Sequence, residues 1–347
     1  MFTATKPVDS TALERQNRRI RKLKAEGVNR TTIFVHEDCR PLLDELRPFL
    51  IDSKQSAGLS TALEEFRAAS SPINVAQVKQ LSPFRYPGGK TWLVPEIRNR
   101  LRASRTIPEV FVEPFAGGAM IGLTTAAERL AEGVVLSELD PDVASVWQTI
   151  FDGTELDVAW LCQKIRTFEV NLENVQRIIS DSPTSRRDRA FKTIVKNRMQ
   201  RGGIMAAGAG LVKVGEAGRG LFSRWSPETL TDRIRALREI RTRVTFECCD
   251  AFQVIQQFAN NPRAFFFIDP PYTAGGKKAG SRLYTHSHVD HNRLFREMSE
   301  VKGSVTMTYD DTPEVRELAS KHGFRTETIN MKSTHHAVMQ ELLITKP

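Results

Sequence analysis

The sequence has few cysteines and no long apolar run, and both absences narrow the class of protein. Its four cysteines, Cys39, Cys162, Cys248 and Cys249, show neither the spacing of zinc ligands nor a disulfide framework. We therefore expect them to be buried, reduced thiols. No apolar stretch approaches the roughly 20 residues that a membrane helix needs, and the N-terminus lacks the apolar region of a secretory signal. These absences predict a soluble, cytoplasmic protein.

A phosphate-binding loop is also missing, although one segment has some of its residues. The segment Gly88-Gly89-Lys90 matches the last part of such a loop and leads into helical sequence. The Walker pattern requires a further glycine upstream, and Arg85, Tyr86 and Pro87 stand before Gly88 instead. The sequence therefore argues against a nucleotide-phosphate loop here.

Positive charge is in excess and is unevenly distributed. The 347-residue chain has a formal net charge of +9. The segment from Arg186 to Arg243 alone contains 15 Lys or Arg and 5 Asp or Glu residues, a net charge of +10. A second basic run, Arg15 to Arg30, has seven Lys or Arg residues against Glu26 alone. Clustered positive charge is typical of a polyanion partner, although a solvated basic surface would show the same pattern.

Strand-like apolar runs alternate with helical periodicity from residue 83 onward, which predicts an α/β, doubly wound sheet. Strands are expected at residues 110–113, 134–138, 244–248, 265–269, 304–308, 325–330 and 341–345. Helical, basic sequence at 151–243 interrupts the alternation and is predicted to be an insertion. The expected organisation is an N-terminal module (1–70), a linker (71–82), a sheet domain (83–150 and 244–347) and the insertion (151–243).

The N-terminal module is expected to contain a short strand at 31–36 and helices at 38–50 and 60–69. So few residues cannot bury a core without a partner. The pattern resembles a ribbon-helix-helix module, in which two chains pair their strands and lay the ribbon in a DNA groove. It would make the protein a homodimer, with Arg30, Thr32 and Phe34, or the alternate face of the strand, toward DNA. The alternative is a small helical appendage packed on the main domain.

The first expected strand runs into a glycine-containing turn, Glu113-Pro-Phe115-Ala-Gly117-Gly118, followed by helical sequence. Doubly wound sheets bind cofactors at such turns, because glycine lets the backbone approach a ligand. About 25 residues later the second strand ends at Glu138, an acid that can accept hydrogen bonds from ribose hydroxyls. The turn lacks the three-glycine fingerprint of pyrophosphate binding. A nucleoside without phosphates, such as S-adenosylmethionine, fits better.

The apolar run 264–268 is followed by Asp269-Pro270-Pro271-Tyr272. The Asp269 carboxylate can accept a hydrogen bond from an exocyclic amine. Proline lacks an N–H and fixes φ, so the neighbouring carbonyl can turn toward the same amine. A tyrosine can stack on a base that has been extruded from its helix. The tetrapeptide therefore suits chemistry on a nucleobase.

In their order along the chain, four segments together resemble bacterial and phage DNA adenine-N6 methyltransferases: Tyr86-Pro-Gly-Gly-Lys90, Glu113 to Gly118, Glu138, and Asp269 to Tyr272. The resemblance covers roughly residues 82–347. It implies a Rossmann-like class I fold that uses S-adenosylmethionine as cofactor. The implied reaction is methyl transfer to adenine N6 in duplex DNA, with base flipping. Restriction–modification is the expected context.

The resemblance also implies roles for individual residues. Those implied at the cofactor are Tyr86, Lys90, Glu113, Phe115, Gly117, Gly118, Glu138, Asp250 and Asp269. Those implied in catalysis are Asp269, Pro270, Pro271 and Tyr272, with Asp269 and the Pro270 carbonyl accepting the two N6 hydrogens. In the insertion, Asn197, Arg198, Arg201 and Gly202-Gly203 are expected to hold phosphates and read bases. Two departures from the family pattern keep their chemistry: Tyr86 stands where Trp is frequent, and Glu138 where Asp is frequent.

Three other interpretations stay open. Cytosine-N4 methylation uses similar geometry, although Asp rather than Ser before Pro-Pro-Tyr favours adenine by family resemblance. The chain could instead be a DNA-binding regulator with a vestigial methyltransferase domain. Finally, His286-Ser-His288-Val-Asp290-His291 has the ligand spacing of dinuclear zinc hydrolases. Such sites need further ligands, for which only His322, His335 and His336 remain, so we expect no metal.

Overall fold

The computed structural model describes residues 78–104, 106–206, 208–215, 218–273, 283, 285–286, 288–332 and 338–347, with a few residues before them (18, 21–22, 24–25, 40 and 43–46). The chain divides into two units, Met1–Ser71 and Pro72–Pro347, and the second is described below. Arg30, Thr32 and the expected strand at 31–36 lie outside the described residues. The ribbon-helix-helix module and the homodimer therefore stay predictions.

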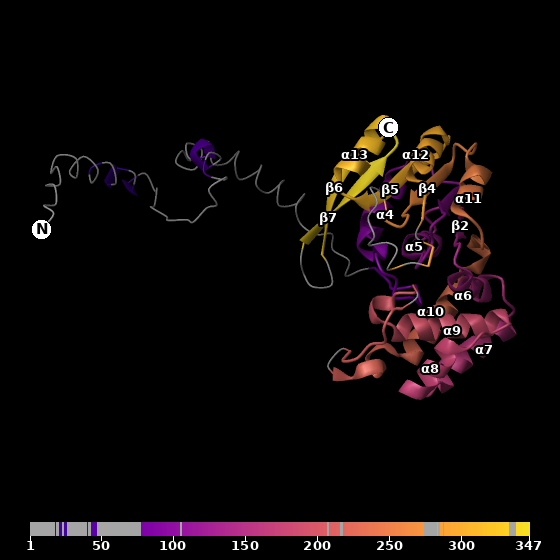
Figure 1. The fold of residues 1–347 in the computed structure, drawn as a ribbon. Coiled ribbons are helices and arrows are strands. Elements are labelled where there is room, and N and C mark those ends of the chain that lie inside the picture. The colour runs from indigo at the N-terminus through magenta and orange to yellow at the C-terminus, as the bar shows by residue number, and fades with distance from the viewer. Residues whose placement is uncertain are drawn as a thin grey trace, which may run out of the picture. The chain divides into compact units, whose positions relative to one another are not determined.

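A seven-stranded sheet forms the centre of the second unit, in the order β3-β2-β1-β4-β5-β7-β6 (Figure 1). Strands β1 to β5 pair in parallel, and β7 runs antiparallel between β5 and β6. The strands are β1 (Val110–Glu113), β2 (Gly133–Ser137), β3 (Val244–Glu247), β4 (Ala264–Ile268), β5 (Ser304–Asp310), β6 (Arg325–Lys332) and β7 (Val338–Thr345). Each strand overlaps one of the seven expected runs, so the prediction of an α/β doubly wound sheet is confirmed.

The apolar runs of the sequence explain which strands lie in the middle of the sheet. Every residue of β1 and of β4 is buried, as expected for parallel strands covered by helices on both faces. In β3, at the edge of the sheet, Thr245 is exposed between the buried Val244 and Phe246. The continuous and alternating patterns thus distinguish central from edge strands.

Helices cover both faces of the sheet and create two hydrophobic cores. One face carries α4 (Val94–Ala103), α5 (Met120–Ala127) and α6 (Pro141–Phe151), and the other carries α11 (Ala251–Phe258), α12 (His291–Glu300) and α13 (Pro313–Lys321). Neighbouring residues of one strand enter different cores: Phe265 and Phe267 join the first, and Phe266 and Ile268 the second. This follows from the two-residue period of a strand.

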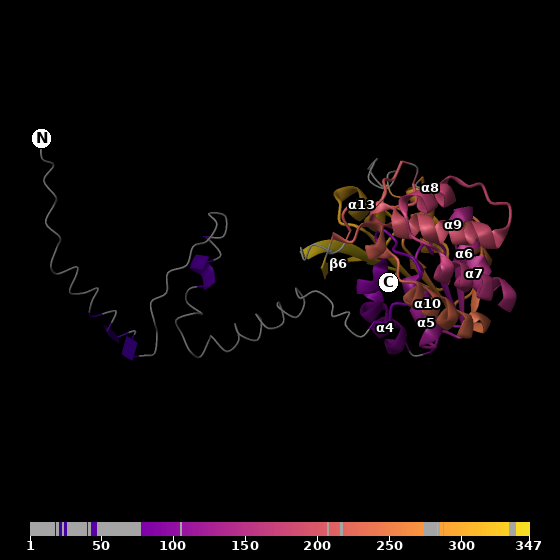
Figure 2. The same cartoon turned by 90° about the horizontal axis from the view of Figure 1, so that it is seen from below.

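Between α6 and β3 the chain forms a helical insertion, which gathers at the bottom of Figure 1 and is seen from below in Figure 2. Its helices are α7 (Glu155–Thr167), α8 (Leu172–Ser180), α9 (Arg186–Met199) and α10 (Pro227–Glu239). Polar residues begin the first three of them, with Thr154 forming a capping box with Asp157, and Asn171 and Ser185 accepting from backbone N–H groups. Helix α9 packs against α6, which joins the insertion to the sheet domain.

Two expectations from the cysteine and hydropathy patterns can be compared with the structure. Cys162 is a buried free thiol as expected, but Cys248 is exposed. The prediction was wrong for Cys248 because β3 ends at Glu247, so the side chain lies beyond the covered part of the sheet. Cys39 lies outside the described residues. None of the helices in the described ranges combines the length and apolar character that crossing a membrane requires.

The sheet order places a crevice at its centre. Strand β1 pairs with β2 on one side and with β4 on the other. The later strands are therefore added to the sheet in opposite directions from β1. Doubly wound sheets bind ligands outside the carboxyl ends of strands at such a switch point. The candidate residues at the ends of β1, β2 and β4 are thereby brought to one place.

Candidate active site

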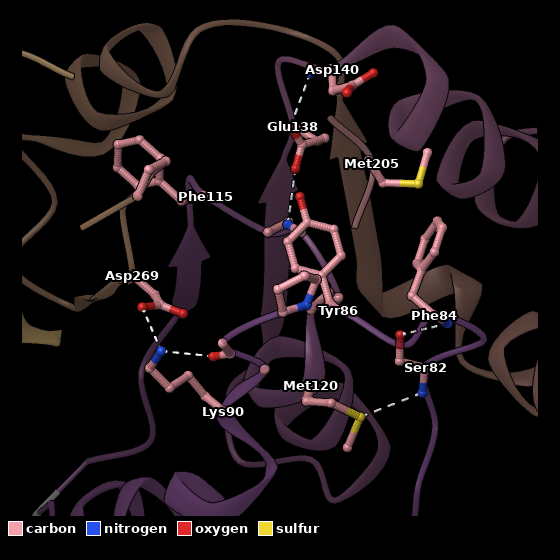
Figure 3. A pocket seen from close by; sticks show the side chains of 18 of the residues that line it. Ser82, Phe84, Tyr86, Lys90, Phe115, Met120, Glu138, Asp140, Met205 and Asp269 are labelled. Carbon is pink, nitrogen blue, oxygen red and sulfur yellow. Dashed lines mark hydrogen bonds and ion pairs between the residues drawn. The ribbon is translucent and has the colours of Figure 1, made fainter. Parts of the chain in front are cut away.

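A cavity of about 1360 Å³ opens at the carboxyl ends of β1, β2 and β4, with walls from both the sheet domain and the insertion (Figure 3). Seven carboxyl side chains line it: Glu113, Glu138, Asp140, Asp250, Asp269, Asp290 and Glu341. The insertion contributes four arginines, Arg198, Arg201, Arg224 and Arg233, here named the arginine wall. Acidic residues of the sheet domain thus share one cavity with basic residues of the insertion.

The turn after β1 is shaped by glycines against Tyr86. Gly117 has a φ of +45°, and a Cβ added there would lie 2.6 Å from the Tyr86 ring. A Cβ on Gly118 would lie 2.9 Å from the Tyr86 Cβ. From the core, the Trp147 indole donates a hydrogen bond to the Gly117 carbonyl at 3.1 Å. Any side chain at either glycine would therefore displace Tyr86 from the turn.

Glu138 lies just beyond the end of β2 and is fixed by the same turn. Its Oε2 accepts from the Gly117 N–H at 3.0 Å, and its Oε1 accepts from the Asp140 N–H at 2.9 Å. Figure 3 shows both bonds, with the Tyr86 ring beside the carboxylate. Burial raises the pKa of Glu138 to about 7, although the backbone donors work in the opposite direction. The carboxyl therefore titrates near neutral pH.

Glu113 is the last residue of β1 and is 4% exposed. Its Oε2 accepts from the Gly122 N–H in α5 at 2.7 Å. A Cβ on Gly122 would lie 2.5 Å from that oxygen, so only glycine permits the contact. Burial, with a smaller contribution from Asp269, raises the pKa of Glu113 to about 8. This carboxyl is therefore mainly protonated at neutral pH and supports the start of α5.

Asp269 follows β4 and is held by two donors. Lys90 Nζ lies 2.9 Å from Oδ1, and the Thr308 hydroxyl donates to Oδ1 at 2.9 Å. The Tyr272 hydroxyl lies 3.2 Å from Oδ1, but its single hydrogen is donated to the nearer carboxylate of Glu341, at 3.0 Å. With Glu341, these residues are here named the Asp269 cluster. Because both donors meet the same oxygen, the carboxylate is held in one orientation.

The Asp269 cluster contains two residues that the sequence motifs did not indicate. Glu341 lies on β7, accepts from the Tyr272 hydroxyl at 3.0 Å and lies 3.7 Å from Lys90 Nζ. Burial above all raises the pKa of Glu341, whereas Lys90 lowers it. Burial lowers the pKa of Lys90, but Asp269 and Glu341 outweigh this and raise it. The only available signal for Glu341 was a charged residue at the start of the apolar run 341–345, and Thr308 gave none.

Tyr272 does not line the cavity, unlike its neighbours Asp269 and Pro271. Its ring stacks on Tyr309 with centroids 5.7 Å apart, and Lys90 Nζ lies 5.0 Å from its centroid. Burial raises the pKa of its phenol well above the ordinary value. The expected stacking of Tyr272 on a base stays a prediction, and it would require this arrangement to change.

Asp250 and Phe115 both line the cavity. Asp250 caps the start of α11 by accepting from the Phe252 N–H at 2.8 Å. Together with Tyr86, Lys90, Glu113, Gly117, Gly118, Glu138 and Asp269, they place every residue expected at the cofactor around one cavity.

The three residues of the insertion that were expected at DNA separate into two groups. Arg198 and Arg201 line the cavity, and Arg201 is exposed, whereas Arg198 is 8% exposed and donates to the Arg224 carbonyl at 3.1 Å. Asn197 is fully buried and bonds to the backbone of Arg85 and Gly203. The structure thus brings the arginines, but not Asn197, to the cavity surface.

The last two residues of the histidine-rich segment are used for capping and packing, whereas His286 and His288 line the cavity. Asp290 caps α12 by accepting from the Arg293 N–H at 3.0 Å. His291 contacts the Tyr309 hydroxyl at 2.9 Å and the Thr273 hydroxyl at 3.0 Å, and burial lowers the pKa of its ring. Among the residues that the structure describes, no three His, Cys, Asp or Glu side chains are grouped to hold a metal. His335 and His336 lie outside those residues.

Solved structures give only a remote likeness. A Pyrococcus horikoshii protein described as a "putative RNA methyltransferase" is 14% identical, with a TM-score of 0.33, over 82% of this chain and 97% of its own. A "putative transferase" from the same organism is 11% identical, with a TM-score of 0.29, over 72% of this chain and 61% of its own. No curated protein matches the sequence. At these scores the two structures carry no argument about substrate.

The family comparison is specific. The model of the D12 class N6 adenine-specific DNA methyltransferases matches residues 86–191 and 219–335, well over half of the chain. The two matched segments contain Tyr86, the glycine turn, Glu138 and Asp269 to Tyr272. Residues 192–218, which include Asn197 and Arg201, lie outside the match. The resemblance drawn from the motifs is confirmed: the chain belongs to the D12 class of N6 adenine-specific DNA methyltransferases.

Proposed function

We propose that this protein transfers a methyl group from S-adenosylmethionine to N6 of an adenine in duplex DNA, with Asp269 as the residue that binds the reacting amine. The observation that carries the proposal is the orientation of Asp269. Two donors, Lys90 and Thr308, hold its Oδ1 at the lining of a cavity whose neighbouring wall is a glycine turn.

The residues around the turn fit a nucleoside cofactor without phosphates. Gly117 and Gly118 let the Tyr86 side chain lie directly on the turn, where its ring offers an aromatic surface. Glu138 and Asp250 are acceptors for the ribose hydroxyls and the adenine amine of the cofactor. When bound, S-adenosylmethionine supplies an electrophilic methyl group carried on a positively charged sulfur. The carboxyl-rich side of the cavity is suited to a ligand with that charge.

The substrate amine is prepared by the end of β4. Adenine N6 is a poor nucleophile because its lone pair is delocalised into the ring. Since Lys90 and Thr308 occupy Oδ1 of Asp269, Oδ2 is the oxygen that accepts one N6 hydrogen, and the Pro270 carbonyl accepts the other. Both bonds draw the hydrogens out of the ring plane and localise the lone pair on nitrogen. As N6 gains the methyl group it becomes acidic and releases one of its two hydrogens as a proton, which carries away the positive charge of the methyl donor. Holding the two reactants in line supplies much of the rate acceleration.

Duplex DNA as the substrate is supported by the arginine wall. Arg198, Arg201, Arg224 and Arg233 are placed on the insertion side of the same cavity, and arginines are the usual partners of DNA phosphates. An adenine inside the helix cannot reach Asp269, so the base must leave its stack, as in other enzymes that modify bases. The adenine-specific family favours N6 of adenine over N4 of cytosine.

The direct test incubates the purified protein with S-adenosylmethionine carrying a labelled methyl group and with duplex DNA, single-stranded DNA or RNA. N6-methyladenine in the duplex is expected, and modified-base sequencing of the DNA would give the target site. Asp269→Asn keeps an acceptor for Lys90 and Thr308 but replaces the second oxygen with a donor. It should lower kcat at least roughly 100-fold, the loss expected when an interaction made in the transition state is removed.

Results other than N6-methyladenine in the duplex would indicate a different substrate or a different function. N4-methylcytosine would favour the alternative base, and labelled RNA would replace DNA as substrate. Wild-type turnover by Asp269→Asn would contradict the proposed role of Asp269. If the duplex takes up no label although the protein binds DNA, the proposed activity is wrong and a regulator with a vestigial domain is favoured.

A further inference from the structure

The insertion is hydrogen-bonded to the backbone of the segment that carries Tyr86. This segment, residues 82–86, runs from Ser82 to Tyr86 and is here named the Tyr86 segment. It lies far from the insertion in the sequence, yet three residues of the insertion meet its backbone: Asn197, Gly203 and Arg233.

Asn197 makes the central contact, with its side-chain amide paired to both the backbone N–H and the backbone C=O of Arg85. Its Oδ1 accepts from the Arg85 N–H at 2.9 Å, and its Nδ2 donates to the Arg85 carbonyl at 3.0 Å. The second Nδ2 hydrogen goes to the Gly203 carbonyl at 2.9 Å. Both amide hydrogens are thereby used, so Asn197 has no donor left for a base or a phosphate.

Two further contacts join the insertion to the same segment. Gly203 has a φ of +74°, and a Cβ added there would lie 1.7 Å from the Arg85 carbonyl oxygen. The two backbones therefore approach as closely as glycine alone allows. The Arg233 guanidinium donates to the Ser82 carbonyl at 2.9 Å. The insertion thus contacts the backbone of the Tyr86 segment near both of its ends.

On its opposite side the Tyr86 segment contacts the cofactor turn. The Tyr86 ring lies on Gly117 and Gly118. Phe84 packs edge-to-face on Trp147 at 5.2 Å, and Trp147 bonds to the Gly117 carbonyl. A shift of Arg85 would therefore move Tyr86 relative to the turn.

We propose that Asn197 is a positioning residue for the cofactor: it holds Arg85, and through it Tyr86, so that the insertion completes the cofactor pocket. The proposal rests on the proposed function, in which Tyr86 and the glycine turn bind S-adenosylmethionine. It assigns Asn197 to the cofactor rather than to DNA, where the sequence pattern had placed it.

An amide is the side chain that this position requires. Only Asn or Gln offers a donor and an acceptor side by side that match the N–H and C=O of one residue, and Gln is longer by one methylene in a site with no exposed surface. Asp has the same size as Asn, but it presents an anionic oxygen to the Arg85 and Gly203 carbonyls in place of a donor. Buried acceptors that lose their donor are costly.

The test compares Asn197→Asp with Asn174→Asp in the full-length protein. Asn174 makes the same kind of bond, to the Glu169 carbonyl at 3.0 Å, but in an exposed position on α8, so it controls for the change in charge. The Kd for S-adenosylmethionine, measured calorimetrically without DNA, should rise at least about tenfold for Asn197→Asp, since each lost buried bond counts for roughly that factor. It should stay within about twofold for Asn174→Asp, because exposed polar changes have small effects.

The Kd for duplex DNA separates positioning from DNA reading. We expect it to change less than about threefold in Asn197→Asp, since the amide has no free donor for DNA. A large loss of DNA affinity with an unchanged Kd for S-adenosylmethionine would overturn the proposal and return Asn197 to base or phosphate recognition. If the wild-type protein itself does not bind S-adenosylmethionine, the proposed cofactor is wrong, which is a different failure.

Hydrogen exchange of the wild-type protein tests the link even if Asn197→Asp fails to fold. The Arg85 amide hydrogen bonds to Asn197 Oδ1 in a loop, where amides ordinarily exchange fast. It should be strongly protected, and S-adenosylmethionine should protect it further because the ligand and Asn197 hold the same segment. An Arg85 amide that exchanges as fast as an open loop, or that does not respond to the ligand, would overturn the proposal.

Discussion

The Asp269 cluster and the arginine wall face one cavity but are built in opposite ways. The Asp269 cluster joins side chains from β5 and β7 to the end of β4, and its lysine is only 4% exposed at the side chain. Its charges are satisfied by one another. The arginine wall belongs to the insertion, and two of its members bond to backbone carbonyls while Arg201 is exposed.

The difference between the Asp269 cluster and the arginine wall follows from the kind of group that each is proposed to bind. A carboxylate that must accept one particular hydrogen needs a fixed orientation, which buried partners on strands provide. A polyanion presents many phosphates, and an always-charged arginine can bind any of them. We infer that the Asp269 cluster determines the chemistry and the arginine wall determines affinity for the substrate. The two sides should therefore respond differently to substitution.

The largest effect is expected from removing the cation of the Asp269 cluster. Lys90→Met keeps the length of the side chain but leaves the carboxylates of Asp269 and Glu341 close to each other without a counter-charge. Removing one partner of a buried ion pair costs about 3–5 kcal/mol, so the melting temperature should fall. We also expect kcat to fall at least about 100-fold, because Asp269 loses a bond that orients it.

Two controls locate the effect in the cluster. Lys321→Met removes an exposed lysine of α13 and should change neither quantity. Glu341→Gln removes a charge but keeps an acceptor for the Tyr272 hydroxyl, so its loss of activity should be much smaller than that of Lys90→Met. Should Lys90→Met retain both its melting temperature and its kcat, the cluster would not orient Asp269.

The sequence predicted the sheet and most of the cavity, because these depend on local patterns. Apolar runs gave the strands, and residues that follow such runs, as Glu138 and Asp269 do, meet at the carboxyl edge of a parallel sheet. Long-range partners gave no comparable signal. Glu341 reaches Lys90 only because β7 runs antiparallel beside β5, and no local pattern fixes that register.

Asn197 shows a second limit of prediction from sequence, because a local pattern does not reveal which side chains are buried. Its neighbours are basic, and the pattern indicated a DNA contact for it, as for Arg198 and Arg201. Burial separates them: Asn197 points into the link with Arg85, while Arg201 is exposed at the cavity. Residue type alone could not distinguish an amide that pairs with a peptide from one that reads a base, because both use the same donor and acceptor.

A smaller effect is expected on the substrate side. Arg201→Ala removes one exposed cation of the arginine wall, so duplex DNA should bind about three- to tenfold more weakly, and the salt dependence of binding should decrease by about one unit of slope. The Kd for S-adenosylmethionine should not change. Arg177→Ala, on α8 and away from the cavity lining, is the matched control. If Arg201→Ala instead weakened cofactor binding alone, the arginine wall would not be the region that determines DNA affinity.

The smallest effect is a pH dependence on the cofactor side. The pKa of Glu138 is raised from 4.5 to about 7, chiefly by burial, so its stabilising contribution is complete below about pH 4.5 and is lost as the pH rises through 7. In the unliganded protein, raising the pH from 6 to 8 should therefore lower the melting temperature. Over the same range S-adenosylmethionine should bind up to about tenfold more tightly, because the ionised carboxylate is the stronger acceptor for its ribose hydroxyls.

Glu138→Gln isolates this contribution. The amino group of the ligand also titrates near pH 8, but it does so equally with both proteins, so the difference between their pH profiles belongs to Glu138. We expect the variant to bind S-adenosylmethionine more weakly at pH 8 and to lose most of the pH dependence of the Kd. Parallel profiles for the two proteins would mean that Glu138 serves only the Gly117 and Asp140 N–H groups. The cofactor side would then be held by Tyr86 and the glycine turn without a carboxylate that senses pH.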